Sequence, residues 1–194
     1  MTIVLASTSP YRRDLLQRLR LPFDVCPPAV DEARHPGEAP LALALRLAEA
    51  KAMEVAPRRP GAIVIGSDQV AELDGEPIGK PHTHEAALAQ LERMQGRRLV
   101  FHTALALVAP GESAVVESVP TTVIFRRLDR GALEAYLKSD QPYDCAGSAR
   151  IESLGIALVE RVESDDPTAL IGLPVIRLIS MLQAAGVAVL GTAR

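Results

Sequence analysis

The chain has 194 residues, of which 48% are hydrophobic and 23% are charged, so it can bury a core and is not disordered. Its formal net charge of -3 argues against a nucleic-acid duplex as partner, because duplex binding needs a broad basic face. A single nucleotide needs only a local basic pocket and is not excluded.

Several features favour a cytoplasmic protein of one domain, residues 1–194. The two cysteines, Cys26 and Cys145, form no CxxC motif and no disulfide framework, which favours a reducing compartment. The first residues carry no basic region, so we expect no signal peptide. No apolar run approaches the ~18 residues of a membrane span, so we expect no membrane association.

Short apolar runs, typical of buried strands, alternate along the chain with segments whose apolar residues recur at helical spacing. Strands are expected at 3–6, 62–66, 99–108, 115–126 and 156–161. The turn signal Asp74-Gly75 makes the short segments 70–72 and 76–78 candidates for a paired hairpin. Helices are expected at 11–19, 41–55, 84–94, 128–139 and 174–185. This order indicates an α/β fold.

The first candidate site lies between the first strand and the first helix, in residues 7–13. Ser9 suits a helix N-cap and Pro10 suits the first helical position. Such a loop presents backbone N–H groups at the positive end of a helix, and Ser7, Arg12 and Arg13 would add donors for a polyphosphate. A capped surface helix with solvated arginines is an equally good interpretation of this segment alone.

Two further candidates are single charged residues beside glycine. Asp68 follows the strand at 62–66, where α/β sheets bind ligands, and it could hold a divalent cation or accept a proton from water. It could equally end the strand and begin a turn. Lys80 lies between Gly79 and Pro81, where a Walker A motif is excluded because proline replaces the Ser/Thr that binds magnesium. Lys80 is aimed at a phosphate or is simply solvated.

Other polar residues carry a weaker signal for a metal. The acidic pairs at 31–32 and 165–166 offer oxygen ligands for a hard cation, although surface pairs of this kind are usually only solvated. His82 and His84 lack an evident third ligand, so capping or exposure is favoured for them.

In chain order, these motifs resemble those of the Maf family of nucleoside triphosphate pyrophosphatases. The matching segments are residues 5–13, 30–32, 46–52, 66–70, 79–81, 146–148 and 171–174. The resemblance implies a mixed, twisted sheet flanked by helices, with two lobes and an active-site cleft, as in inosine triphosphatase-like proteins. It also suggests a homodimer.

The resemblance further implies cleavage between the α and β phosphates of a nucleoside triphosphate. Asp68 would accept the proton of the attacking water, and Glu32 and Asp68 would hold Mg²⁺ or Mn²⁺. The residues that would bind and neutralise the phosphates are Ser7, Arg12, Arg13, Lys51 and Lys80.

Three positions depart from the commonest family pattern and resemble the subfamily that acts on 7-methyl-GTP: Tyr11, Gln69 and Glu152. Methylation at N7 makes guanine cationic, so an aromatic ring such as that of Tyr11 would stack well on it. Glu152 would accept hydrogen bonds from guanine N1–H and N2–H₂. The alternatives are a pyrophosphatase for dTTP and UTP, and a nucleotide-binding regulator of cell division with little catalysis.

Overall fold

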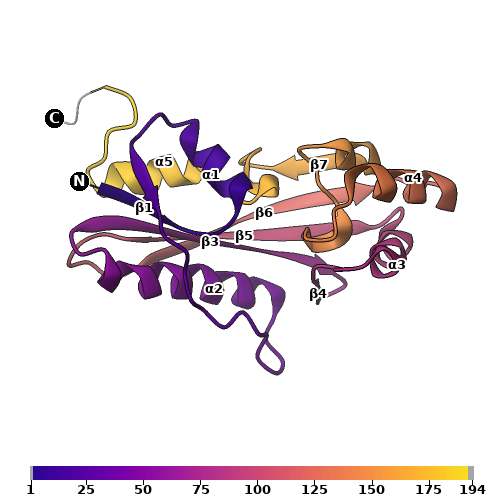
Figure 1. Cartoon of the computed structure of the whole chain (residues 1–194), viewed down its shortest axis with the longest axis horizontal. Helices are drawn as coiled ribbons and strands as arrows, with labels where there is room; N and C mark the ends of the chain where they lie inside the picture. The colour runs from indigo at the N-terminus through magenta and orange to yellow at the C-terminus, as the bar shows by residue number, and fades with distance from the viewer. Residues whose placement is uncertain (1, 192–194) are drawn as a thin grey trace.

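A computed structural model describes residues 2–191, which form one mixed sheet with helices on both faces (Figure 1). The strands are β1 (Thr2–Ala6), β2 (Phe23–Val25), β3 (Ala62–Leu73), β4 (Glu76–Ile78), β5 (Arg98–Val108), β6 (Val115–Phe125) and β7 (Val159–Ser164). The α-helices are α1 (Pro10–Gln17), α2 (Pro40–Val55), α3 (His84–Met94), α4 (Arg130–Asp140) and α5 (Val175–Ala184). Within the described part, no helix is both long and apolar enough to cross a bilayer.

The strand order is β2-β1-β3-β5-β6-β7, and β4 pairs with β3 beyond the end of β1. The β1 strand is parallel to both of its neighbours, whereas β3, β5, β6 and β7 pair in antiparallel fashion. The expected mixed α/β sheet is therefore confirmed.

Alternation along β3 decides which helix covers which face of the sheet. Val64 packs in the apolar cluster beneath α2, whereas Ile63 and Ile65 pack in the cluster beneath α1 and α5. A third cluster joins α3 and α4 to the far end of the long strands. Figure 1 shows the resulting two lobes, one around β1, α1, α2 and α5 and the other around α3 and α4, spanned by β3, β5 and β6.

The backbone of α2 lies directly on β3 at Gly66. A Cβ atom built at Gly66 would lie 2.2 Å from the carbonyl oxygen of Ala48 and 2.8 Å from the amide nitrogen of Ala52. Only glycine permits this approach, because any side chain there would overlap the helix backbone. The contact brings the face of α2 that carries Lys51 close to the residues that follow Gly66.

The edge of β3 is open where the two lobes meet. The pairing of β1 ends with Ala6 opposite Gly66, and the pairing of β4 begins with Ile78 opposite Ala71. Residues 67–70 therefore have a strand neighbour on one side only, namely β5. An incomplete edge of this kind leaves room for a ligand between the lobes.

The prediction of a strand that ends at residue 66, just before Asp68, was wrong. The strand continues to Leu73, because β5 pairs with it from Val64 to Glu72, and Asp68 lies in its middle. The carboxyl end that borders the site belongs to β1 instead.

Other boundaries differ less from expectation. Ser9 caps α1, since its Oγ accepts a bond from the Arg12 N–H at 3.4 Å. The strand expected at 156–161 is a 3₁₀ turn up to Leu158 and then becomes β7, which runs on to Ser164.

Candidate active site

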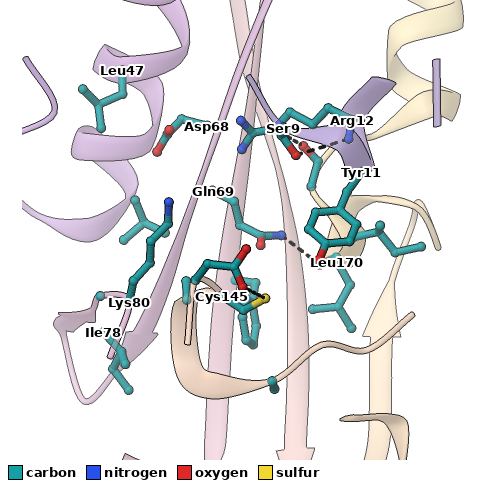
Figure 2. A pocket seen from close by; sticks show the side chains of 18 of the residues that line it. Ser9, Tyr11, Arg12, Leu47, Asp68, Gln69, Ile78, Lys80, Cys145 and Leu170 are labelled. Carbon is teal, nitrogen blue, oxygen red and sulfur yellow. Dashed lines mark hydrogen bonds between the residues drawn. The ribbon is translucent and has the colours of Figure 1, made fainter. Parts of the chain in front are cut away.

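A cavity of about 660 Å³ opens at the free edge of β3, between the two lobes. Of the residues proposed from the sequence, its lining includes Tyr11, Arg12, Glu32, Lys51, Asp68, Gln69, Lys80 and Glu152. Figure 2 shows the side chains of Asp68, Arg12 and Lys80 directed into the same space, with Tyr11 on the opposite side of Gln69 from Lys80. Residues far apart in the sequence therefore converge on one cavity.

The two candidate metal ligands share one ammonium group. Lys51 Nζ lies 2.6 Å from Glu32 Oε1 and 2.6 Å from Asp68 Oδ1. The Lys51 and Asp68 side chains are 7% and 11% exposed, whereas that of Glu32 is 57% exposed. Partial burial raises the pKa of Glu32, but the hydrogen bond from Lys51 and nearby positive charges outweigh it, so the pKa lies below its ordinary value. Glu32 is therefore ionised at neutral pH.

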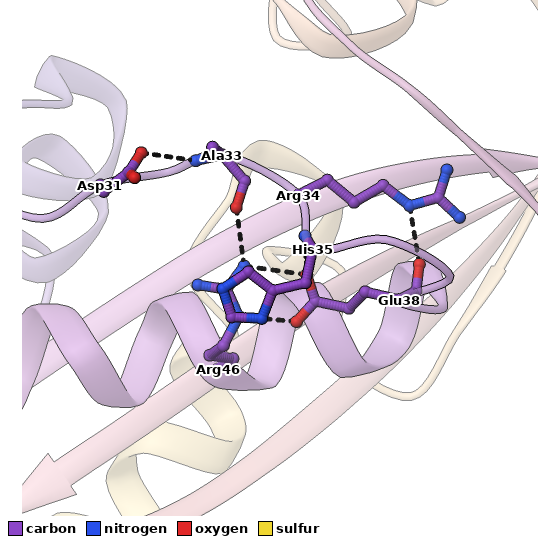
Figure 3. A network of polar contacts seen from close by, with 6 residues as sticks. All are labelled: Asp31, Ala33, Arg34, His35, Glu38 and Arg46. Carbon is purple, nitrogen blue, oxygen red and sulfur yellow. Dashed lines mark hydrogen bonds and ion pairs between the residues drawn. The ribbon is translucent and has the colours of Figure 1, made fainter.

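A polar network fixes the loop that carries Glu32 (Figure 3). Arg46 on α2 donates from Nε and a terminal nitrogen to the two carboxylate oxygens of Glu38, at 2.6 and 2.8 Å. The same guanidinium donates to the carbonyl of Ala33 at 3.0 Å. Asp31 Oδ1 accepts from the Ala33 N–H at 2.9 Å, so this carboxylate shapes the loop and does not point at the cavity. Arg46 thus ties the residue that follows Glu32 to α2.

The side chains of the two neighbouring arginines of α1 point in different directions, and only that of Arg12 lines the cavity. Arg12 donates from Nε to the carbonyl of Gly172 at 2.8 Å, and Ser67 Oγ donates to the same carbonyl at 3.0 Å. Burial lowers the pKa of Arg12, and the charges of Asp68 and Glu32 oppose that effect. This guanidinium presents its remaining donors to the cavity.

Arg13 and Ser7 do not line the cavity as expected. The Arg13 side chain is 53% exposed and lies near Asp14, because it projects from the outer face of the first turn of α1. Ser7 is buried, and its hydroxyl accepts a bond from the Ser9 N–H at 3.1 Å. Ser7 therefore shapes the loop without reaching the space that a ligand would occupy.

Gln69 lines the cavity and hydrogen-bonds to β5 and to the segment 169–170. Its amide nitrogen donates to Thr103 Oγ1 at 2.9 Å and to the carbonyls of Ala169 and Leu170 at 2.9 and 3.0 Å. Because these partners are a hydroxyl and two carbonyls, the NH₂ group faces them and the amide oxygen faces away. Gln69 therefore links β3 to the segment that precedes Gly172 and has only an acceptor left for a ligand.

Tyr11 and Glu152 border the other end of the cavity, beside Arg150. The Arg150 guanidinium carbon lies 6.0 Å from the centre of the Tyr11 ring, a cation–π distance. Arg150 also donates to the carbonyl of Asp140 at 3.0 Å, which anchors the segment that carries Glu152. Burial raises the pKa of Glu152, so this carboxylate lies where a cationic ligand would stabilise its charge.

Of the remaining sequence candidates, Asp166 and His84 have structural roles. Asp166 is 2% exposed, and its carboxylate accepts bonds from Thr168 and from the Ile176 and Arg177 amides at the start of α5. It is a buried cap and not a cation site. His84 Nδ1 lies 3.0 Å from the Tyr143 hydroxyl, whereas His82 lines the cavity.

Cys145 also lines the cavity, although it carried no sequence signal for this site, and the carbonyl of Gly172 holds Arg12 in place there. Burial raises the pKa of the Cys145 thiol to about 11, so it is protonated at neutral pH and unsuited to be a nucleophile. The family motif at 171–174 contains Gly172, but its role depends on the carbonyl, which every residue has.

The donor set suits a magnesium-like ion. Among residues 2–191, no three side chains of the types His, Cys, Asp and Glu gather as a metal cage. Glu32 and Asp68 instead offer two carboxylates beside an open cavity. Mg²⁺ is commonly held by one or two carboxylates, with substrate phosphates and water completing its coordination. The residues therefore fit a cation that arrives with a phosphorylated ligand.

Comparisons with known proteins agree with this site. A sequence model of the family described as Maf-like protein matches residues 2–185. A protein from Polaromonas sp. named 7-methyl-GTP pyrophosphatase is 59% identical, and the match covers 96% of this chain and 85% of that one. A protein of the same name from Albidiferax ferrireducens is 54% identical over 97% of this chain and 96% of its own.

Among solved structures, a HAM1 protein from Coxiella burnetii is similar at 20% identity, over 66% of this chain and 74% of that chain, with a TM-score of 0.47. A similarity of that size says nothing about activity. The family model covers nearly all of the described residues, and relatives of more than half identity match almost the full length. The chain therefore belongs to the Maf-like protein family.

Proposed function

We propose that this protein is a divalent-metal-dependent pyrophosphatase that hydrolyses 7-methyl-GTP to 7-methyl-GMP and diphosphate. The observation that carries the proposal is the charge arrangement of one cavity. Its phosphate end combines the carboxylates of Glu32 and Asp68 with basic side chains, and its other end combines the aromatic ring of Tyr11 with the carboxylate of Glu152. Relatives that carry the name 7-methyl-GTP pyrophosphatase support the choice of substrate.

At the phosphate end, Arg12, Lys51 and Lys80 bind the triphosphate and stabilise the charge that develops as the α–β bond breaks. The fork of Arg12 suits two phosphate oxygens at once, and its bond to the Gly172 carbonyl holds it in position. A bound Mg²⁺ or Mn²⁺, held by Glu32 and Asp68, would supply charge neutralisation of the phosphates.

Asp68 is proposed as the proton acceptor for the attacking water. Its Oδ1 faces Lys51 and Glu32, where the metal would be held, so Oδ2 is left for the water. Its place in the middle of β3 makes it a rigid base, since the strand is paired with β5 on one side and covered by α2. No covalent intermediate is needed.

At the base end, Tyr11 stacks on the cationic 7-methylguanine ring and Glu152 accepts from its N1–H and N2–H₂ groups. A carboxylate with a raised pKa gains more from a cationic partner than a well-solvated one does. Thymine and uracil offer only one such donor and carry no positive charge, which disfavours dTTP and UTP as substrates.

The test is pyrophosphate release from a panel of canonical and modified triphosphates with Mg²⁺ and with Mn²⁺. We expect 7-methyl-GTP to be the best substrate; a clear preference for dTTP or UTP would support the alternative pyrophosphatase activity. Absence of release from every nucleotide, with nucleotide binding intact, would support the regulator of cell division instead.

The Asp68→Asn variant separates catalysis from binding. It keeps the shape and one acceptor but removes the base, so we expect turnover to be lost while 7-methyl-GTP still binds. Full activity of this variant would contradict the role of Asp68. A cytoplasmic location, a single domain and a homodimer remain part of the proposal, and fractionation and sedimentation of the purified protein would test them.

A further inference from the structure

The ammonium group of Lys51 lies between the two carboxylates that are proposed to hold the metal. Its Nζ is 2.6 Å from both Glu32 Oε1 and Asp68 Oδ1. These two contacts belong to residues on three different elements, a loop, α2 and β3, so the ammonium is what joins them. The close contact between α2 and Gly66 holds Lys51 in this position, and the Lys51 side chain is almost fully buried.

An ammonium group and a divalent cation compete for such a position. Both are positive, and both need the same carboxylate oxygens as partners, so they repel each other when close. Mg²⁺ also demands a near-octahedral set of oxygens at about 2.0–2.1 Å, which a lysine between its two protein ligands obstructs. Occupation by Lys51 therefore opposes metal binding to the ligand-free protein.

A triphosphate changes this balance. The phosphate end of the cavity contains three positive side chains, Arg12, Lys51 and Lys80, and the carboxylates of Glu32 and Asp68. The other two carboxylates that line the cavity, Asp144 and Glu152, lie near the positive charge of Arg150. A divalent cation alone would increase the excess of positive charge at the phosphate end of the cavity, whereas a metal–triphosphate complex would bring excess negative charge. Phosphate oxygens would also give the Lys51 ammonium a new partner, which frees the carboxylates.

We propose that Lys51 is an internal counter-ion that takes the place of the metal in the ligand-free protein. The divalent cation then enters together with the triphosphate, and Lys51 turns from the carboxylates to the phosphates as it does so. This inference rests on the proposed function, because it assigns an order of binding to the same site. It makes Lys51 a positioning residue before substrate binds and a phosphate ligand afterwards.

The test measures Mn²⁺ binding without any nucleotide, from the loss of the free-ion signal in electron paramagnetic resonance. We expect the wild-type protein to leave Mn²⁺ largely free. The Lys51→Met variant should bind Mn²⁺ at least roughly tenfold more tightly, and the added Glu32→Gln substitution should abolish the gain.

Lys80→Met is the matched control, because it removes one positive charge from the same cavity without vacating the position between the carboxylates. It should change Mn²⁺ affinity much less than Lys51→Met does. Equal gains in the two variants would show a general charge effect and overturn the proposal.

The wild-type protein by itself also decides the question, should Lys51→Met fail to fold. Tight nucleotide-free Mn²⁺ binding that disappears in Glu32→Gln would overturn the proposal, and Lys51→Gln provides a second, more polar replacement for the folded comparison. Pyrophosphate release is measured on the same preparation. Tight Mn²⁺ binding by an active enzyme refutes only the order of binding, whereas absent hydrolysis with any nucleotide refutes the proposed function.

Discussion

Arg12 and Gly172 are joined by a 2.8 Å hydrogen bond, from the guanidinium Nε to the backbone carbonyl, across 160 positions of the sequence. The same carbonyl accepts the Ser67 hydroxyl, so it ties the start of α1 and the open edge of β3 to one point. The bond takes up one nitrogen of the arginine and fixes the plane of the other two.

Arg12→Lys should lower kcat/KM for 7-methyl-GTP by about 10²-fold, a loss typical of removing one preset donor to a transition-state oxygen. Lysine keeps the charge but loses both the Gly172 contact and the planar fork. Arg13→Lys is the matched control and should leave the rate near that of the wild-type protein, since Arg13 lies outside the cavity. Steady-state kinetics of both variants checks this, and equal losses would place Arg13 in the site.

Gly66→Ala should lower the free energy of unfolding by about 1–3 kcal/mol, the usual cost of overpacking. Its Cβ would overlap the backbone of α2, which cannot move aside as a flexible side chain can. Gly79→Ala is the control, because a Cβ there meets nothing within 4 Å. Urea unfolding of the two variants provides the comparison, and similar stabilities would show that α2 can shift without cost.

Glu152→Gln should reduce the preference for 7-methyl-GMP over GMP by roughly tenfold, because the neutral amide loses the attraction to the cationic methylated ring, and two unit charges ~4 Å apart attract by about 1–4 kcal/mol at a protein surface. Burial raises the pKa of Glu152, so the wild-type preference should decline as the pH falls, at a higher pH than for an ordinary carboxyl group. Calorimetric titration with the two monophosphates across pH measures this. The Gln variant should show no such decline, and a parallel decline would assign the effect to another group.

The Glu38–Arg46 pair should stabilise the fold in a pH-dependent way. The hydrogen bond from Arg46 holds the pKa of Glu38 at about 2, below its ordinary 4.5. Since the folded value is the lower one, the stabilisation is complete above the unfolded pKa and is lost as the pH falls toward the folded one. Glu38→Gln should therefore differ from the wild-type protein in urea unfolding at neutral pH and converge with it in acid. A constant difference would refute the linkage.

The sequence by itself determined the elements whose signals are local. Ser9 and Pro10 begin α1, and most of the apolar runs became strands, because capping and side-chain alternation act over a few residues. The motifs also identified most of the charged residues that line the cavity, since their types and chain order suffice for that.

Tertiary structure alone decided how those residues face one another. Strand pairing with β5 carried β3 past the expected end at residue 66 and put Asp68 in its middle. Helical phase turned Arg12 inward and Arg13 outward, although the two are adjacent in the sequence. The close approach of α2 to Gly66 set Lys51 between two carboxylates. Such contacts depend on packing between distant segments, and no local pattern of residues encodes the distance between them.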